Sequence, residues 1–289
     1  MYVRLFDVTW DKSLQCAAPV GTISFCDSVP SALAPVPVVF ITNETFLNSP
    51  PETIPSLANH VFEKISGICT QNHLQYKEIQ IDCDWSDKTQ ARYFEFLRRL
   101  SLRLSAGQYL SATIRLHQVK YRQITGVPPV KRGMLMFYNM GKISANKKSN
   151  SIYNEQDAGR YTQWIKHYPL PLDMALPAFS WGIHVRDGRV MELLNNLTSE
   201  DFLKNPLFGS TEPGYFKAKS SFFFRGFYFM QDDLVKIEQT SPRLTLAAAR
   251  QLERSLNRAV RSVSIYHCDS LIFTRYEKSD FSKVFHCFH

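Results

Sequence analysis

Short apolar runs with the two-residue period of a β-strand alternate along this chain with longer segments of helical period. Strand-like runs occupy residues 2–7, 21–26, 35–46, 78–85, 109–118, 131–140, 169–181 and 262–269, and amphipathic helices are expected at 56–68, 86–104, 155–167 and 241–258. Consecutive parallel strands need crossover connections, which helices usually supply. The alternation over 289 residues therefore predicts an α/β fold, a (β/α)8 TIM barrel.

One long segment, 183–236, departs from this alternation and is expected to elaborate the crossover between strands 7 and 8. It contains a hairpin signal at Asp187-Gly188 and an aromatic run at 222–229. We expect a single domain spanning 1–289, with this segment as a small inserted lobe. The alternative fold, an open doubly wound sheet, lacks support because no Gly-rich phosphate loop follows the first strand.

The net charge of +8 comes from Lys and Arg residues that are scattered rather than gathered in a stripe. This distribution argues against a nucleic-acid partner. There is no run of about 18 apolar residues, so no membrane span is expected. None of the six cysteines forms a CxxC pair, and no cofactor is expected. The chain opens directly in strand-like sequence without a signal peptide, which we interpret as a trimmed or mature N-terminus that leaves the compartment open.

Polar residues stand at the carboxyl ends of the expected strands. In the run 78–86, Asp82 and Asp84 share one side of an extended chain, because side chains alternate between faces. Active sites of α/β barrels lie at this end of the strands, so such side chains are expected to converge from distant positions. The full set is Asp7, Glu44, Asp82, Asp84, Arg115, His117, Tyr138, Asn139, Ser180, Trp181, His267 and Asp269.

Four short motifs resemble those of a known family. Asp82-Cys83-Asp84-Trp85 resembles the fourth-strand signature Asp-x-Asp-x-Asp-Trp-Glu of family-18 chitinase-like glycosidases, and MFYN at 136–139 resembles their sixth-strand Met-x-Tyr-Asp. ALPAF at 175–179 resembles their seventh-strand Gly-x-Pro-x-Tyr, and IYHCD at 265–269 falls where their final strand carries an aromatic residue. The resemblance implies a TIM barrel that acts on an oligo- or polysaccharide.

The chain is also similar, over nearly its whole length, to a group of uncharacterised bacterial proteins, many from Bacteroidetes. The similarity rests on IQIDCDW at 79–85, LSATIRLHQ at 110–118, RGMLMFYNMG at 132–141 and PLPLDxALPxFSWG at 169–182. The expected activity, and a periplasmic or cell-envelope location, are implied by the chitinase-like resemblance alone.

Two positions depart from the chitinase-like pattern. Ser86 stands where the family carries its general acid Glu, and Asn139 stands where it carries Asp. A hydroxyl cannot supply a proton as a carboxylic acid of tuned pKa does. The sequence therefore predicts a glycoside hydrolase-like protein that would have to use other acids.

The resemblance and the residue types together divide the candidates by role. Candidate catalytic groups are the carboxylates Asp82, Asp84, Glu44 and Asp269. Candidate substrate-binding groups, which would hydrogen-bond or stack on a sugar, are Asp7, Trp85, Arg115, His117, Tyr138, Asn139, Trp181 and His267.

Two other functions fit the same residues. In a non-catalytic carbohydrate-binding barrel, the sugar platform would be Trp85, Tyr138, Phe179 and Trp181. In a metal-dependent hydrolase, the ligands would come from Asp7, Asp82, Asp84, His117, His267 and Asp269, although no His-x-His or HExxH spacing supports that site.

Overall fold

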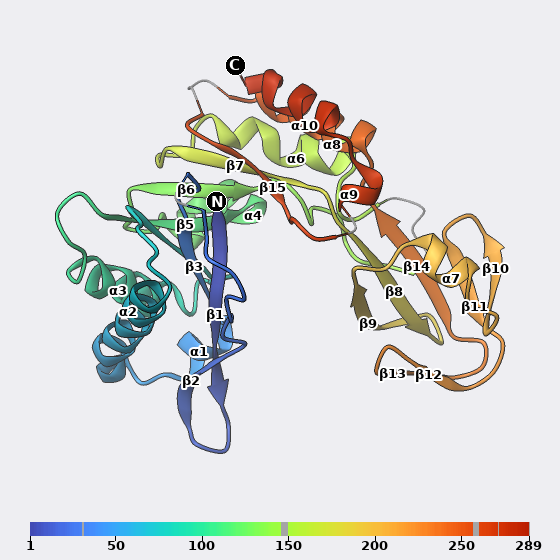
Figure 1. The fold of residues 1–289 in the computed structure, drawn as a ribbon, viewed down its shortest axis with the longest axis horizontal. Helices are drawn as coiled ribbons and strands as arrows, with labels where there is room; N and C mark the ends of the chain where they lie inside the picture. The colour runs from blue at the N-terminus through green and yellow to red at the C-terminus, as the bar shows by residue number, and fades with distance from the viewer. Residues whose placement is uncertain (31, 146–149, 257–259, 271, 289) are drawn as a thin grey trace. The chain divides into compact units, whose positions relative to one another are not determined.

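The computed structural model describes residues 1–30, 32–145, 150–256, 260–270 and 272–288. The chain divides into two compact units (Figure 1). Unit 1 comprises Met1–Leu135 and His167–Asp173, and unit 2 comprises Met136–Lys166 and Met174–His289. No helix in the described part of the chain is both long enough and apolar enough to cross a membrane.

Unit 1 is built on parallel strands connected by helices. Its elements are β1 (Tyr2–Asp11), β2 (Cys16–Val20), β3 (Val36–Ile41), α1 (Asn43–Asn48), η1 (Pro51–Thr53), α2 (Ile54–Gln71), β4 (Glu78–Asp82), α3 (Gln90–Ser101), β5 (Tyr109–Arg115), α4 (Leu116–Lys120) and α5 (Arg122–Thr125). β1, β3, β4 and β5 pair in parallel, and β2 pairs antiparallel with β1. The strand-and-helix alternation predicted for this region is therefore confirmed from β3 to β5, whereas β1 and β3 are connected through β2.

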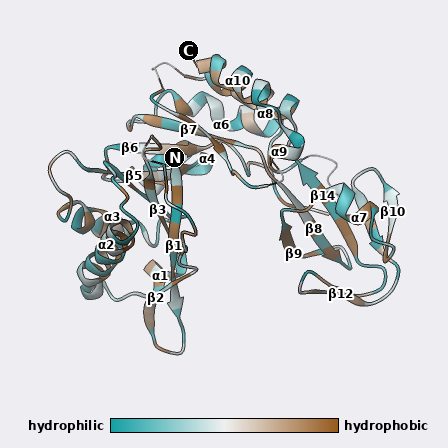
Figure 2. Cartoon of the chain, in the orientation of Figure 1, coloured by the Kyte–Doolittle hydropathy of each residue, from teal (hydrophilic) through white to brown (hydrophobic). Residues whose placement is uncertain are grey.

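The two long helices of unit 1 pack against each other through apolar stripes. α2 buries Leu57, Val61 and Ile65, and α3 buries Leu97 and Leu100, so apolar residues recur at helical spacing on one side of each helix. The two helices are in contact, and both show hydrophilic and hydrophobic sides in Figure 2. These apolar stripes were expected from the sequence, and they form part of the hydrophobic core of unit 1.

Unit 2 combines two further parallel strands with a separate antiparallel sheet. Its elements are α6 (Glu155–Ile165), most of β7 (Leu172–Pro177), β8 (Ser180–Arg186), β9 (Arg189–Asn195), α7 (Ser199–Leu203), β10 (Phe208–Glu212), β11 (Tyr215–Ala218), β12 (Phe222–Phe224), β13 (Phe227–Phe229), β14 (Leu234–Gln239), α8 (Pro242–Glu253), β15 (Val263–Tyr266), α9 (Ile272–Arg275), α10 (Lys278–Phe285) and η2 (His286–Phe288). β15 pairs in parallel with β7. The expected helix end at residue 258 lies outside the described residues.

The antiparallel sheet has the order β10-β11-β14-β8-β9, and with α7 and the β12–β13 hairpin it forms a lobe over residues 180–239. Asp187 and Gly188 have φ values of 50° and 73°, which a type I′ hairpin turn between β8 and β9 requires. The hairpin predicted at these two residues is confirmed. The lobe has its own core, made of Leu194, Leu197, Phe202, Phe208, Phe216, Ala218, Phe229 and Val235.

The large sheet has the strand order β15-β7-β6-β5-β4-β3-β1-β2, where β6 is Arg132–Met136. Among the described residues this order includes no pairing between β15 and β1. The strand predicted at 21–26 is wrong, because β2 forms earlier and pairs antiparallel with β1. The cause is a tight turn in which the Asp11 carboxylate accepts hydrogen bonds from the amides of Ser13 and Leu14, and Gln15 adopts a φ of 51°.

Several strands end earlier than the apolar pattern predicts. The run 35–46 stops at Ile41, because the Thr42 side chain caps α1 by accepting a hydrogen bond from the Thr45 amide. The run 109–118 stops at Arg115, whose amide donates to the side chain of Gln118 in α4. The run 169–181 divides into β7 and β8. Apolar alternation therefore placed these strands but not their ends.

Phe202 and Leu203 are neighbours that test the lobe core directly. Phe202 is 1% exposed and Leu203 is 67% exposed. Phe202→Ala should lower the free energy of unfolding by about 3–5 kcal/mol, because it leaves a cavity in the core. Leu203→Ala should change it by less than about 0.5 kcal/mol. Urea denaturation of both variants measures the difference, and equal effects would contradict the assignment of this core.

Candidate functional site at the strand ends

β4 and β5 present a ladder of polar side chains to one face of the sheet, which we call the polar ladder. Its three lower rungs are Glu78 with Tyr109, Gln80 with Ser111, and Asp82 with Thr113, joined by hydrogen bonds of 2.8, 3.4 and 2.5 Å. Asp84 and Arg115 form the top rung just beyond β4. Parallel pairing in register sets these partners, because every second residue faces the same way.

The top rung is a two-pronged ion pair. The Arg115 Nε donates to Asp84 Oδ1, and the Arg115 Nη2 donates to Asp84 Oδ2 at 2.9 Å. A guanidinium fork and a carboxylate match in this geometry, which fixes both side chains. Asp84 is exposed and Arg115 is partly exposed, so the pair stands at the solvent end of the ladder.

Asp82 lies one rung deeper, and its carboxyl differs from that of Asp84. Burial raises the pKa of Asp82 above its ordinary value of 3.8, and the nearby charge of Asp84 acts in the same direction. The Thr113 hydrogen bond and the charges of Arg115 and Arg4 oppose the rise, but burial outweighs them. The two acids therefore have different environments, as the crowding of two carboxylates predicts.

Ser86 follows the ladder and binds its neighbours in the loop before α3. Its amide donates to Thr89 Oγ1 at 2.9 Å, and the Thr89 hydroxyl donates to Asn43 Oδ1 at 2.5 Å. The hydroxyls of Ser86 and Thr89 are 3.3 Å apart. This network fixes the turn that leads from β4 into α3.

Trp85 does not belong to the surface of the site. Its side chain is 1% exposed, stacks on Tyr93 with ring centroids 5.1 Å apart, and donates from Nε1 to the Thr125 carbonyl at 2.7 Å. The expectation that it contacts substrate is therefore wrong. Because Asp84 faces the ladder, the next residue faces the helices, and a large apolar ring there becomes core.

The other sequence candidates of unit 1 do not lie within the strand ends where they were predicted. Asp7 lies within β1, which continues to Asp11, and it pairs with Arg4 at 2.5 Å. Glu44 lies in the first turn of α1 and pairs with Lys12 at 3.2 Å, both being exposed. His117 is exposed on α4. Asp7 is not at a strand end, because β1 is longer than expected, whereas Glu44 and His117 follow the ends of β3 and β5 within short helices.

Unit 2 has an aromatic cluster of its own, where β7 and β15 end. Tyr138 and Tyr266 stack with ring centroids 5.0 Å apart and planes 12° apart, and Phe179 meets both edge-on at 5.7 and 5.6 Å. Tyr138 and Phe179 are buried, whereas Tyr266 is 41% exposed. Tyr266 is thus the exposed ring of the cluster, held flat against a buried one. Sequence reasoning noted an aromatic position here but did not include Tyr266 among the candidates.

Trp181 joins this cluster and is held by a buried carboxylate. It meets Phe179 edge-on at 5.4 Å and donates from Nε1 to Glu238 at 3.1 Å. The same carboxylate accepts from the Ser151 amide and hydroxyl, and from Lys236 Nζ at 2.6 Å. Glu238 was missed, although a Lys and a Glu two residues apart in an apolar strand are a signal of a buried pair.

The remaining candidates of unit 2 are His267 and Asp269, which follow β15, and Asn139, which follows β6. His267 Nε2 lies 2.9 Å from Asp269 Oδ2, and His267 stacks near Phe179 at 6.2 Å. The Nδ1 of His267 is buried and has no hydrogen-bond partner among the described residues. Asn139 is exposed, with a φ of 54°. The described residues contain no cluster of three or more His, Cys, Asp or Glu side chains arranged to hold a metal.

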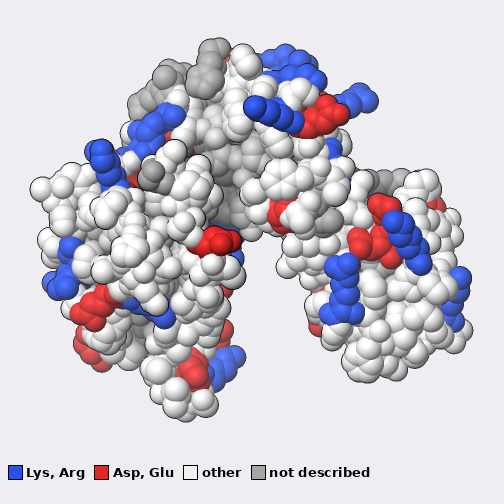
Figure 3. All heavy atoms as spheres, in the orientation of Figure 1, with Lys and Arg blue, Asp and Glu red and all other residues white. Residues whose placement is uncertain are grey.

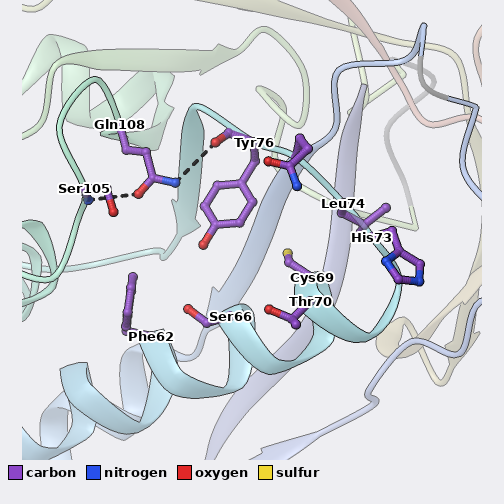
Figure 4. Close-up of a pocket in the computed structure, with 10 residues that line it drawn as sticks. Phe62, Ser66, Cys69, Thr70, His73, Leu74, Tyr76, Ser105 and Gln108 are labelled. Atoms are coloured by element: carbon purple, nitrogen blue, oxygen red, sulfur yellow. Dashed lines mark hydrogen bonds between the residues drawn. The ribbon is translucent and has the colours of Figure 1, made fainter.

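A separate hollow lies at the opposite end of β4 and β5. It has a volume of about 410 Å³ and is lined by hydroxyl, amide and thiol groups, including Ser66, Cys69, Tyr76 and Gln108 (Figure 4). Tyr76 precedes β4 and Gln108 precedes β5, so the hollow marks the amino ends of these strands. In α/β barrels that end serves stability rather than chemistry, and we place the candidate site at the other end.

Comparison with solved structures finds proteins of the same fold. The spore cortex-lytic enzyme SleL of Bacillus cereus matches with a TM-score of 0.54 at 13% identity, covering 100% of this chain and 67% of that chain. A chitinase from Chromobacterium violaceum matches with a TM-score of 0.55 at 9% identity, covering 99% and 90%. The chain has the chitinase fold. The resemblance seen in the four sequence motifs is thereby confirmed.

One further structure of this fold is a chitinase-like agglutinin from Robinia pseudoacacia. It matches with a TM-score of 0.51 at 9% identity, covering 88% of this chain and 81% of that chain. No family model and no curated protein sequence matches the chain. The chain therefore shares its fold with proteins to which it has little sequence identity.

In this chitinase-fold chain, the raised pKa of Asp82 has a consequence for stability. The folded chain binds the Asp82 proton more tightly than the unfolded chain does, so this carboxyl contributes stability below pH 3.8 and loses it as the pH rises through the raised value. Asp82→Asn removes the titration. We expect the free energy of unfolding of the variant to increase relative to that of the unmodified chain between pH 4 and pH 7. Urea denaturation across this range measures it, and a difference that does not change with pH would refute the shift.

Proposed function

We propose that the chain is a carbohydrate-binding protein that holds an oligosaccharide at the carboxyl ends of its parallel strands. The observation that supports this most directly is Tyr266, an exposed ring stacked flat on buried Tyr138. An aromatic face of this kind buries the apolar face of a sugar ring and leaves the sugar hydroxyls free for polar groups. Because Tyr138 and Phe179 fix the ring, little side-chain entropy is lost on binding.

Each unit, taken by itself, carries polar side chains beside its strand ends that suit sugar hydroxyls. In unit 1, Asp84 and Arg115 offer acceptors and donors at the solvent end of the polar ladder. In unit 2, His267 and Asp269 lie beside the aromatic cluster, with His267 Nε2 2.9 Å from Asp269 Oδ2.

The environment of the acids favours binding over chitinase chemistry. Ser86 stands where the chitinase-like motif has its acid, and its amide and hydroxyl lie against Thr89. Asp84 is held on both oxygens by Arg115. Proton transfer to a glycosidic oxygen needs a carboxylic acid that can reach it, and neither residue provides one. The Robinia protein, which is named an agglutinin, gives a precedent for this fold in a protein named for binding.

We also propose that the parallel strands belong to a (β/α)8-type barrel with residues 180–239 inserted in the crossover between β7 and β15. The parallel pairings from β15 to β7 and from β5 to β1 support this, as does the likeness to chitinase structures. The antiparallel β2 occupies the outer edge of β1.

Removal of the Tyr266 ring tests the binding proposal. Tyr266→Ala should weaken oligosaccharide affinity about tenfold or more, because the loss of one stacking face costs over about 1.4 kcal/mol. Phe273→Ala is the matched control, since Phe273 is an exposed aromatic residue of α9 outside the cluster. Calorimetric titration with chito-, cello-, xylo- and manno-oligosaccharides measures both. The proposal fails if none of these ligands binds, or if both variants bind like the unmodified chain.

A second function, glycoside hydrolysis with Asp82 as proton donor, is favoured by one observation. Burial raises the pKa of Asp82, as a general acid requires. In that reaction the protonated Asp82 would transfer its proton to the glycosidic oxygen as the C–O bond breaks. The oxygen of a water molecule would bond to the sugar carbon, and Asp84 would take the proton that this water loses. The roles predicted for Glu44 and Asp269 remain predictions.

Turnover measurements separate the two functions. If Asp82 is the acid, release of reducing ends from a soluble glycan should fall by a factor of about 100 or more in Asp82→Asn. Asp87→Asn, which alters an exposed carboxylate nearby, should leave the rate unchanged. A chain that binds oligosaccharides but releases no reducing ends would exclude hydrolysis and retain the binding function.

A further inference from the structure

The β12–β13 hairpin of the lobe is made almost wholly of aromatic residues. Its cross-strand pairs are Phe222 with Phe229, Phe223 with Tyr228, and Phe224 with Phe227. Arg225 and Gly226 form the turn, with φ values of 51° and 85°. Both values are positive, as a type I′ turn requires, so the strands are joined with minimal length.

The hairpin has one buried and one exposed aromatic face. Phe222, Phe224 and Phe229 pack on the lobe core, with Phe222 and Phe229 stacked at 5.6 Å. On the other face, Phe223 is 74% exposed and Tyr228 is 44% exposed. Their ring centroids are 5.0 Å apart and the planes are tilted by 49°. The two exposed rings are therefore not coplanar.

A buried carboxylate holds this hairpin in place. Asp233 accepts a hydrogen bond from the Met230 amide at 2.8 Å and pairs with His184 at 2.8 Å and with Arg186 at 2.7 Å. Arg186 also donates to the Tyr228 carbonyl at 3.1 Å. These contacts anchor the strand that carries Tyr228, so the exposed pair is presented with little freedom to move.

The charge of the lobe argues against an anionic partner. Residues 180–239 contain seven Lys and Arg against eight Asp and Glu. The part of the lobe where Figure 1 places the hairpin shows mostly uncharged atoms in Figure 3. Attraction to an anionic membrane would need an excess of basic residues beside the aromatic rings. The exposed pair of Phe223 and Tyr228 is therefore suited to a neutral partner.

The exposed area is too small for a stable dimer. From their exposed fractions, Phe223 and Tyr228 offer about 250 Å² between them, whereas a standard interface buries about 800 Å² on each partner. A polysaccharide chain needs much less area at any one point, since each sugar ring contacts one or two aromatic rings.

We propose that the exposed face of the β12–β13 hairpin is a docking surface for a neutral, insoluble polysaccharide, separate from the binding site at the strand ends. The proposal rests on the proposed carbohydrate-binding function and adds a second contact point within the lobe. Two rings tilted by 49° cannot both lie flat on the planar face of a crystalline polymer, whereas a single flexible chain can follow them. Amorphous material should therefore be retained more strongly than crystalline material.

Sedimentation with insoluble chitin and cellulose, in amorphous and crystalline forms, tests this surface. The double variant Phe223→Ala, Tyr228→Ala should lose about tenfold in affinity for the amorphous polymer. Leu203→Ala, which removes an exposed apolar side chain elsewhere in the lobe, should bind like the unmodified chain. Both changes are at the surface, and circular dichroism of each variant confirms that the fold is intact.

Soluble oligosaccharides distinguish this surface from the strand-end site. The double variant should bind them as the unmodified chain does, whereas Tyr266→Ala should not. If oligosaccharides bind but retention on the polymers is the same with and without the hairpin rings, the docking surface is refuted and the strand-end site stands. Retention that depends on the hairpin without any oligosaccharide binding would refute the strand-end site alone. The docking surface is also refuted if the double variant changes the oligomeric state or abolishes sedimentation with neutral lipid vesicles.

Discussion

The register between β4 and β5 determines where the chemistry of unit 1 lies. Parallel pairing places Gln80 beside Ser111 and Asp82 beside Thr113, and the same alternation carries Asp84 to Arg115. Shifting the register by one residue would turn these side chains into the apolar core and bring Ile81 and Cys83 to the polar face. The ion pair at the solvent end and the buried acid beneath it both follow from this single alignment.

The polar ladder also explains why Asp82 and Asp84, which are close together in the sequence, have different surroundings. Asp84 lies beyond the end of the strand and pairs with the guanidinium of Arg115 at the solvent-exposed surface. An ion pair in this position loses little hydration. Asp82 remains between strands, with a hydroxyl as its direct partner, and burial raises its pKa. Unit 2 also contains a buried carboxylate, that of Glu238. This carboxylate is stabilised by direct hydrogen bonds from Lys236, Ser151 and Trp181. In that case the carboxylate orients an aromatic ring beside Phe179.

The sequence correctly predicted those features of the site that depend only on the alternation of side chains along a strand or on a turn between neighbouring residues. The common face of Asp82 and Asp84, the polar face of β5 ending at Arg115, and the hairpin at Asp187-Gly188 all follow from neighbouring residues. The misplaced groups depend on distant contacts or on caps. Trp85 became core because Tyr93 and Thr125 enclose it, and Glu44 moved into a helix because Thr42 caps α1. Tyr266 and Glu238 gain their roles only from partners far along the chain, which spacing does not reveal.

The constant separation of 31 residues between ladder partners has an evolutionary consequence. α3 and its flanking loops can gain or lose residues without altering any rung, because length in a surface connection is tolerated. One residue inserted inside β4 would instead reverse the facing of every rung beyond it. Variation among descendants of this chain should therefore accumulate in the connection between the two strands, while the strands themselves keep their length.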